Sequence, residues 1–545
     1  MRRIRRQTSR PAAVSWLTIE SVTPANQAPR CNEALALFEK RKGGQTGGRE
    51  GCGRPGTGVD APLGAWRGRC RHARDLEAWR SWFELRSCRG QGRGGVGLMI
   101  GKPPVRFTKV RNGWVGYQVA GDGSPDVLLI PAFAGHLDWL WEAPGFTQFM
   151  SHLASRGRFI VLDRRGCGCS DRLPSGASYL DEWMFDVLGV LEAVGSRRVA
   201  LVGIDTASPM ALILAATFPD RVSALILFEA YARMTYAPDY EMGYGPEITD
   251  NARNFISQSW GDGTNGLRGN PDIAGDQYLE DLYARLERAA MSRTEAAEAI
   301  SCWLELDVRD VLPSVRAPVL LFHASASPSI KPDFGRFVGE HLSDARVVEY
   351  RSRNHNGWAF PEHLPTVLAE VDRFLSIGRP VPSADRMLAT ILFTDVVSST
   401  ERMATIGDRE WRSQIDTLDD RTRRCVEANG GRIVKGTGDG SLAAFEGPAR
   451  AITAAQELIG SARHLGMSVR AGLHTGEIEL RNDDVTGLAV NIASRVSGYA
   501  QPGQVLVTRT VKDLVVGSGL KFIDEGEHTL KGLPESWRLY TVTPS

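Results

Sequence analysis

Short apolar runs alternate with amphipathic segments between residues 105 and 375. Because these runs are consecutive Val, Ile and Leu rather than alternating apolar and polar residues, they predict strands buried on both faces, as in a parallel sheet. The strand signal stops between about 231 and 312, where Leu279, Leu282 and Leu286 recur at helical spacing. We therefore expect an α/β layer fold with a helical cap inserted over the carboxyl edge of the sheet. The predicted strands are 126–130, 159–162, 199–202, 224–228, 319–322 and 347–350.

A second apolar pattern, of the βαβ kind, begins at residue 387 and continues to the end of the chain at 545. It follows residues 376–386, whose Pro, Gly and Ser content is typical of a linker. Residues 1–98 differ from both regions, because they are rich in Arg and Gly and show little hydrophobic periodicity. They predict a disordered basic extension, or an upstream addition to a protein that begins near Met99. The sequence thus predicts two folded domains, 105–375 and 387–545.

The chain has 545 residues and a formal net charge of +1, so its overall electrostatics do not favour binding to nucleic acid or to a membrane. The balance is uneven, because residues 1–98 carry about +11 (19 Lys and Arg against 8 Asp and Glu) and the remainder is acidic. No uninterrupted apolar run reaches the ~18 residues that a membrane helix needs. Eight cysteines without regular spacing argue against a disulfide framework, so a cytoplasmic location is expected. For Cys167 and Cys169, burial in a Gly-rich turn is favoured over a metal-binding pair.

The segment GIDTA around Asp205 lies between a predicted strand and an apolar helical segment. Small residues around a sharp strand-to-helix turn are typical of a nucleophile elbow, where one side chain stands exposed above the sheet. Together with the motifs DRRGCGCSD and TFPDRVSALIL, this region resembles the α/β-hydrolase family. In place of the usual nucleophilic serine the chain has Asp205, and His355 lies where the family has its catalytic histidine.

Asp205 has two interpretations. The region is similar to haloalkane dehalogenases and epoxide hydrolases, in which an aspartate forms an ester that a His-activated water cleaves. That resemblance implies Asp205 as nucleophile, His355 as base and Glu229 as the orienting acid. Two residues depart from the dehalogenase pattern. Thr206 follows Asp205 where that pattern has a tryptophan, and Phe133, which follows the predicted strand 126–130, replaces the usual polar residue. In the other interpretation the domain is a degenerate hydrolase fold that senses a small apolar ligand or supports a dimer, with Asp205 as a turn residue.

Two aspartates of the second region lie at predicted chain reversals. Asp395 ends the apolar run in LATILFTDVVSST, and Asp439 lies at the glycine-rich tip of GRIVKGTGDGSLAAF. Carboxylates at rigid strand ends are suitable ligands for hard divalent cations, and a pair of such cations promotes phosphoryl transfer. A third segment, DVTGLAVNIASR, has Asn491 and Arg495 four residues apart, on one face of a helix.

These three motifs resemble the class III nucleotidyl cyclase catalytic domain, which has a ferredoxin-like α+β fold. The resemblance implies that Asp395, Asp439 and the backbone carbonyl of Val396 hold two Mg²⁺ or Mn²⁺ ions per active site. Lys435 and Asp484 match the pair that selects the base, and a lysine donor with a carboxylate acceptor suits adenine, so ATP is favoured over GTP. The remaining matches are Asn491 and Arg495, which orient the ribose and stabilise charge on the transferring phosphate, and Lys531, which meets the terminal phosphates.

The class III family builds each active site from two chains, with the metal aspartates from one and the base-selecting and phosphate-binding residues from the other. The resemblance therefore implies a head-to-tail homodimer with two composite sites. The leading hypothesis is an adenylate cyclase that converts ATP into 3′,5′-cyclic AMP and pyrophosphate, with the hydrolase-like domain as a regulator or second enzyme. This domain pairing is similar to that of mycobacterial and rhizobial cyclases. The alternatives are a guanylate cyclase, a hydrolase with a regulatory cyclase domain, and a ligand sensor without catalysis.

Overall fold

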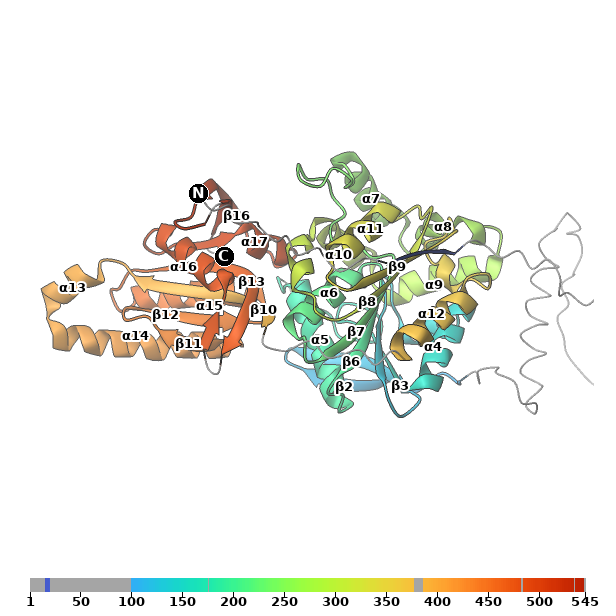
Figure 1. The fold of residues 1–545 in the computed structure, drawn as a ribbon, viewed down its shortest axis with the longest axis horizontal. Coiled ribbons are helices and arrows are strands. Elements are labelled where there is room, and N and C mark those ends of the chain that lie inside the picture. Colours follow the sequence, from blue (N-terminus) through green and yellow to red (C-terminus); the bar gives the residue numbers. More distant parts are fainter. Residues whose placement is uncertain are drawn as a thin grey trace, which may run out of the picture. The chain divides into compact units, whose positions relative to one another are not determined.

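The computed structural model describes residues 15–19, 100–174, 176–376, 386–481, 484–533 and 535–543 (Figure 1). Of the predicted basic extension, residues 15–19 are described, and they form strand β1 (Ser15–Ile19). The rest of that prediction lies outside the described residues, as do residues 377–385 of the predicted linker. In the described ranges, no helix is both long and apolar enough to cross a membrane.

Nine strands within the described residues form the first sheet. Besides β1 they are β2 (Arg106–Val110), β3 (Gly113–Ala120), β4 (Asp126–Ile130), β5 (Arg158–Leu162), β6 (Val199–Ile204), β7 (Val222–Phe228), β8 (Val319–Ala324) and β9 (Ala345–Tyr350). Their order is β1-β9-β8-β7-β6-β4-β5-β3-β2. The six predicted strands correspond to β4 to β9, which pair in parallel, so the predicted α/β layer fold is confirmed. The antiparallel hairpin of β2 and β3 lies outside the predicted strands.

Both faces of this sheet are buried, as the continuous apolar runs predict. In β4, Leu128 and Ile130 pack into one apolar core together with residues of α5 and α6, whereas Val127 and Leu129 pack into a second core with residues of α4 and α12. The helices that flank the sheet are α3 (Leu137–Leu140), α4 (Pro144–Arg156), α5 (Tyr179–Ala193), α6 (Ala207–Thr217), α11 (Pro332–His341) and α12 (Leu364–Ser376), with a 3₁₀ turn η3 (Gly357–Ala359).

Between β7 and β8, where the cap is predicted, residues 229–318 are all described and are mainly helical (Figure 1). Helix α10 begins with a capping box, in which Ser292 and Glu295 each accept a hydrogen bond from the other's backbone amide. The side chain of Asp276 caps α9 in a similar way. The helices of this segment are α7 (Pro246–Ser259), α8 (Thr264–Gly269), η1 (Pro271–Ile273), α9 (Gln277–Ala290), α10 (Arg293–Glu305) and η2 (Arg309–Ser314).

A second sheet of eight strands is formed by described residues after 385. Its strands are β10 (Arg386–Val396), β11 (Arg432–Gly436), β12 (Gly440–Phe445), β13 (Val469–Arg481), β14 (Asp484–Thr486), β15 (Val505–Thr508), β16 (Phe522–Thr529) and β17 (Ser536–Val542). The order is β11-β12-β10-β13-β15-β17-β16, and β14 pairs with β13. The sheet is mixed, since β13 and β15 are parallel and the other pairs are antiparallel, which agrees with the predicted α+β class.

Strand β10 separates two apolar layers in this second region. Leu392 packs into the core that includes residues of α14 and α15, whereas its neighbour Ile391 packs with residues of α16 on the other face. Alternation along the strand therefore sends successive side chains to opposite cores. The helices are α13 (Ser399–Ile406), α14 (Asp408–Ala428), α15 (Pro448–Arg463), α16 (Leu488–Tyr499) and α17 (Arg509–Leu514).

A buried ionic cluster fixes the loop that follows β5. Arg165 is fully buried, and its Nε donates to Asp186 Oδ1 at 2.6 Å while Nη2 donates to Glu182 Oε2 at 2.6 Å. The backbone amide of Arg165 also donates to Asp186 Oδ2 at 2.9 Å. Because both carboxylates come from α5, this cluster ties the loop to that helix.

Removing one partner of such a cluster leaves a buried charge without compensation. We therefore expect Asp186→Ala to lower the free energy of unfolding by roughly 3–5 kcal/mol, measured by urea denaturation. Glu192→Ala, at an exposed position near the end of the same helix, is the matched control and should change it by less than about 0.5 kcal/mol. Similar effects of the two substitutions would contradict this role for Arg165.

Candidate active sites

The two predicted metal-binding aspartates of the second region lie next to each other. Asp395 is near the end of β10 and pairs in register with Gly440, the residue that follows Asp439. The backbone amide of Val396 donates to the carbonyl oxygen of Asp439 at 3.2 Å. A Cβ atom at Gly440 would lie 2.0 Å from the carbonyl oxygen of Thr394, so this close approach requires glycine.

Each of the two carboxylates has a polar partner. Arg470 lies opposite Asp395 on β13, and its Nε and Nη2 donate to Asp395 Oδ2 at 2.9 and 2.5 Å. Ser399 Oγ, at the first residue of α13, donates to Asp439 Oδ2. Its neighbour Ser398 has a φ of 57°, in the left-handed region that non-glycine residues seldom adopt. The donor set of two carboxylates and the Val396 carbonyl consists of hard oxygen ligands, which fits Mg²⁺ or Mn²⁺.

The predicted base-selecting residues form an ion pair with each other. Lys435 Nζ lies 2.8 Å from both carboxylate oxygens of Asp484, although the two residues are on different strands, β11 and β14. The hydrogen bond from Lys435 holds the pKa of the Asp484 carboxyl below its ordinary value. Both side chains are about half exposed, at 50% and 47%, so the pair is accessible to a ligand.

The remaining predicted residues lie on the surface. Asn491 and Arg495 are exposed on α16, whereas their neighbours Ile492 and Val496 are buried. Lys531 is exposed in the turn that follows β16. Among the described residues, the side chains that bond to the Asp395 and Asp439 carboxylates are Arg470 and Ser399, so no such bond joins these aspartates to the other predicted residues within one chain.

In the first region, Asp205 occupies a sharp turn between β6 and α6. Its φ is 52°, its backbone amide donates to the carbonyl oxygen of Phe228 at 2.8 Å, and its carbonyl oxygen accepts from the amide of Ser208 at 2.8 Å. The side chain is 20% exposed, whereas the rest of the turn is largely buried. This is the geometry that the sequence predicts for an elbow.

The structure brings together all three residues of the predicted hydrolytic set. His355 Nε2 lies 3.3 Å from Asp205 Oδ2, and His355 Nδ1 lies 3.9 Å from Glu229 Oε2. Glu229 is fully buried, and its Oε1 accepts from the amide of Ala324 at 2.7 Å and from the hydroxyl of Tyr350 at 2.9 Å. Burial alone would lower the pKa of His355, but the neighbouring carboxylates of Asp205 and Glu229 raise it above its ordinary value.

Comparison with known proteins identifies both domains. Residues 125–360 match the family model of the alpha/beta hydrolase fold, and residues 381–544 match that of the adenylate and guanylate cyclase catalytic domain. The chain therefore carries an α/β-hydrolase fold followed by an adenylate/guanylate cyclase domain. Both predicted resemblances are thereby confirmed.

Two curated relatives and one solved structure are among the proteins similar to this chain. A putative adenylate cyclase 3 of Rhizobium meliloti is 29% identical over 175 residues, which are 30% of this chain and 29% of the relative. An adenylate cyclase of Streptomyces coelicolor is 30% identical over 141 residues, 26% of this chain and 37% of the relative. The crystal structure of a bromoperoxidase from Bacillus anthracis has a TM-score of 0.43 at 17% identity, covering 50% of this chain and 99% of that protein. The chain thus spans about a third of the length of these two curated cyclases.

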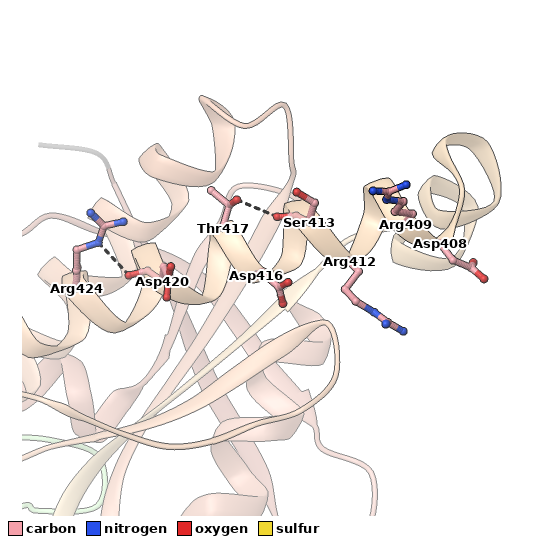
Figure 2. Close-up of a pocket in the computed structure, with 8 residues that line it drawn as sticks. All are labelled: Asp408, Arg409, Arg412, Ser413, Asp416, Thr417, Asp420 and Arg424. Atoms are coloured by element: carbon pink, nitrogen blue, oxygen red, sulfur yellow. Dashed lines mark hydrogen bonds between the residues drawn. The ribbon is translucent and has the colours of Figure 1, made fainter.

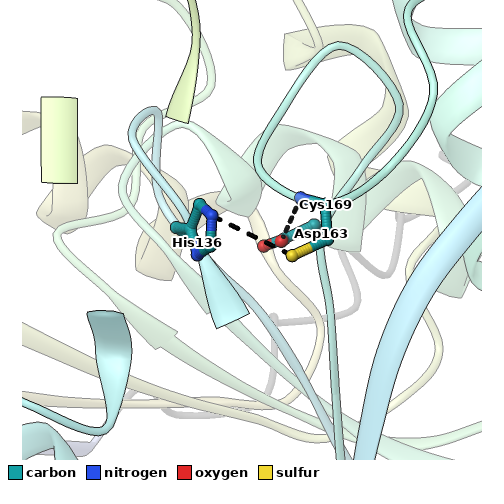
Figure 3. A group of neighbouring side chains, drawn as sticks. All are labelled: His136, Asp163 and Cys169. Atoms are coloured by element: carbon teal, nitrogen blue, oxygen red, sulfur yellow. Dashed lines mark hydrogen bonds between the residues drawn. The ribbon is translucent and has the colours of Figure 1, made fainter. Parts of the chain in front are cut away.

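The cysteines of the hydrolase region do not form a pair. Cys167 is buried, with Sγ 3.3 Å from the carbonyl oxygen of Gly135. Cys169 instead approaches His136 and Asp163, and the ligand-type atoms of these three lie within 4.8 Å of one another (Figure 3). Asp163 Oδ2 accepts from the amide of Cys169 at 2.8 Å, so the carboxylate holds the turn in place. Burial raises the pKa of the Cys169 thiol to about 12, which keeps it protonated.

The exposed side of α14 in the cyclase domain carries a shallow polar hollow (Figure 2). Two of its side chains donate hydrogen bonds to the backbone of the same helix. Thr417 Oγ1 donates to the carbonyl oxygen of Ser413 at 2.8 Å, and Arg424 Nε donates to that of Asp420 at 3.2 Å. Positive and negative residues are interspersed along it, which is typical of a solvated helix face. The lining residues are Asp408, Arg409, Arg412, Ser413, Asp416, Thr417, Asp420 and Arg424.

Arg470 is the site residue of the cyclase domain that the motifs do not reveal. Its contact with Asp395 depends on the pairing of β10 with β13, and the two residues are 75 positions apart in the sequence. A search for charged residues opposite Asp395 in a predicted neighbouring strand would have identified it, once that register was known.

The raised pKa of His355 predicts a pH-dependent contribution to stability. A pKa raised above the unfolded value of ~6.5 stabilises the folded state fully below about pH 6.5, and this contribution is lost as pH rises through the folded pKa. His355→Gln should therefore lower the free energy of unfolding more at about pH 6 than at about pH 9, measured by urea denaturation. In an Asp205→Asn background the pH-dependent part should shrink. A cost that is equal at both pH values would argue against the Asp205–His355 pair.

Proposed function

We propose that this protein is an adenylate cyclase that converts ATP into 3′,5′-cyclic AMP and pyrophosphate at composite sites of a homodimer. The observation that carries the proposal is the juxtaposition of Asp395 and Asp439 at adjoining chain reversals, inside the region that matches the cyclase family. Two oxygen-rich side chains fixed by backbone pairing supply a rigid site for divalent cations.

In this proposal Asp395, Asp439 and the Val396 carbonyl hold two Mg²⁺ or Mn²⁺ ions. Such ions, when bound, lower the pKa of the ribose 3′ hydroxyl and neutralise the pyrophosphate that leaves. The guanidinium of Arg470 contacts Asp395. In this proposal it therefore belongs to the same half of the site and would lie beside the triphosphate. Its charge would stabilise negative phosphate oxygens as bond breaking proceeds.

Lys435 and Asp484 are proposed to read the base. Their ion pair holds a donor and an acceptor side by side, and adenine offers an acceptor at a ring nitrogen and a donor at its exocyclic amine. Opening this pair costs little, because both side chains are about half exposed and solvent screens the interaction. Asn491, Arg495 and Lys531 are exposed on the same domain. In the proposed dimer, these residues of one protomer meet the ribose and phosphates of the nucleotide at the metal site of the other.

The proposal is tested by identifying the cyclic nucleotide that the protein forms. Purified full-length protein is incubated with ATP or with GTP in the presence of Mn²⁺ or Mg²⁺, and the product is identified by mass spectrometry. Cyclic AMP from ATP supports the proposal, whereas cyclic GMP from GTP in its place supports the guanylate cyclase alternative. A doubly substituted Asp395→Asn/Asp439→Asn chain is the control and should form neither product. No cyclic nucleotide from the unsubstituted chain would refute it.

Composite sites predict complementation between inactive chains. Asp395→Ala and Arg495→Ala chains should each be inactive, but their equimolar mixture should recover about one quarter of unsubstituted activity, because half of randomly formed dimers are mixed and each has one of two sites intact. Arg470→Ala should recover activity with Arg495→Ala but not with Asp395→Ala, since Arg470 and Asp395 share one half-site.

Two affinity tags establish that mixed dimers form. If mixed dimers are present and no mixture recovers activity, the shared-site arrangement is wrong. Recovery in the Arg470→Ala and Asp395→Ala mixture would place Arg470 in the opposite half-site.

A second candidate function belongs to the hydrolase region, because His355 lies close to both Asp205 and Glu229. In this proposal the Asp205 carboxylate attacks a substrate carbon, an ester bond forms, and a halide or an epoxide oxygen leaves with the electron pair. His355 then takes a proton from water, which attacks the ester and regenerates Asp205. The buried Glu229 stabilises the imidazolium that results. The region acts either as this second enzyme or as a regulator of the cyclase.

This chemistry predicts a trapped ester when the second step is blocked. His355→Phe protein incubated with a 1-bromoalkane or a terminal epoxide should gain the mass of the alkyl or hydroxyalkyl group, and peptide mapping should locate it on Asp205. The Asp205→Asn/His355→Phe chain should gain no mass at that peptide. Absence of the adduct, together with no hydrolysis by the unsubstituted protein, would leave the regulatory role as the remaining proposal.

A further inference from the structure

The carboxyl ends of strands β4 and β5 bring three side chains with metal-ligand atoms together. Because these two strands are parallel neighbours, the loops that follow them leave the sheet at the same edge. The loop after β4 carries His136, and the loop after β5 carries Asp163 and Cys169. One ligand-type atom from each of the three lies within 4.8 Å of the others, and Cys169 Sγ is 3.9 Å from His136 Nε2 (Figure 3).

Asp163 is a buried carboxylate that the described residues satisfy only in part. The residue is 1% exposed. Its Oδ2 accepts hydrogen bonds from the backbone amides of Leu137 and Cys169 at 3.2 and 2.8 Å, whereas Oδ1 is buried and has no hydrogen-bond partner among the described residues. The nearby Lys102 pairs with Asp138 instead, at 3.0 Å. A buried carboxylate oxygen without a partner is costly, and it is retained mainly where something else compensates it.

The separations of the three ligand atoms suit a tetrahedral ion. An ion bound at ~2.3 Å from a thiolate sulfur and ~2.0 Å from an imidazole nitrogen holds these two atoms about 3.6 Å apart. The Sγ–Nε2 distance of 3.9 Å is close to this value. A Cβ atom at Gly168, whose φ is 56°, would lie 2.0 Å from Asp163 Oδ2, so the turn that presents Cys169 requires glycine. His136 and Cys169 are partly exposed, which gives an ion access from solvent.

We propose that His136, Asp163 and Cys169 bind one Zn²⁺ ion, with a water molecule as the fourth ligand. Nitrogen, oxygen and sulfur donors together form a set that zinc prefers, whereas Mg²⁺ and Ca²⁺ prefer oxygen ligands alone. A carboxylate and a thiolate balance the two charges of the ion, and the Cys169 thiol releases its proton to solvent on binding. The ion would join the loops after β4 and β5. This assignment is independent of both proposed enzyme activities.

His136 has to exchange one hydrogen bond in order to bind the ion. Its Nδ1 accepts from the backbone amide of Asp138 at 3.2 Å, so in the neutral ring Nε2 carries the proton. When Nε2 binds zinc, the proton moves to Nδ1 and this cap of the four-residue helix α3 is lost. A capping bond is weak compared with the binding of a structural zinc ion, so the exchange favours the ion. His136→Asn therefore removes the ligand but supplies a residue that caps helices well.

The test uses the full-length Asp395→Asn/Asp439→Asn chain as its starting protein, so that ions at the proposed cyclase site do not contribute. Metal is removed with EDTA, and Co²⁺ is titrated as a spectroscopic substitute for zinc. A thiolate-to-Co²⁺ absorption band should appear and should disappear when Zn²⁺ is added. Cys169→Ala should lose the part of this band that corresponds to one Co²⁺ per chain, and His136→Asn should weaken that binding at least tenfold. The control Cys167→Ala removes a buried thiol two residues away and should keep the band.

Thermal unfolding provides a second readout. Zn²⁺ should raise the unfolding midpoint of the starting protein and of Cys167→Ala, but not that of Cys169→Ala or His136→Asn, and Mg²⁺ should raise none of them. If Cys169→Ala does not fold, the His136→Asn comparison decides. An unchanged Co²⁺ band in Cys169→Ala, loss of the same band in Cys167→Ala, or an equal response of the starting protein and His136→Asn to Zn²⁺ would each overturn the proposal, because the three side chains would then form only a hydrogen-bonded turn.

Discussion

Backbone pairing at strand ends is the constraint on which both candidate sites depend. In the cyclase domain, the register of β10 with β12 sets Asp395 beside the hairpin that carries Asp439, and the approach is so close that Gly440 must lack a side chain. In the hydrolase region, β6 and β7 run in parallel, so Asp205 and Glu229 follow the ends of adjacent strands. Hydrogen bonds between strands thus fix carboxylates that would repel each other in a flexible chain.

The sequence predicted most reliably those elements that follow from the local pattern of apolar residues. Continuous apolar runs identified β4 to β9, because strands buried on both faces need apolar residues at every position. Strands β2 and β3 were not predicted. Most of β2 is exposed or partly exposed, and β3 (GWVGYQVA) mixes Gly and Gln with its apolar residues, so neither strand gives a continuous apolar run. Arg470 was missed for another reason. Its significance depends on the residue that lies opposite it on the neighbouring strand, which neither residue type nor spacing along the chain reveals.

The charged side chains of the two candidate sites differ in their exposure to solvent. The residues proposed to bind the nucleotide, such as Lys435, Asp484 and Arg495, are exposed, so water stabilises their charges. At the hydrolase site, Glu229 and His355 are buried, whereas the side chain of Asp205 is 20% exposed. Exposed charges suit a site assembled from two chains around a large anionic substrate.

Backbone strain argues that the hydrolase site has kept a role. Among the described residues, the non-glycine residues with positive φ are Asp205, Glu229 and Ser398, and all three lie at the two candidate sites. Each such conformation costs about 1–3 kcal/mol and persists where its surroundings enforce it. A mere turn residue at Asp205 would be better as glycine, which adopts this φ freely. Retaining a strained carboxylate that contacts His355, with a strained Glu229 behind it, therefore favours a ligand-handling site over a degenerate turn.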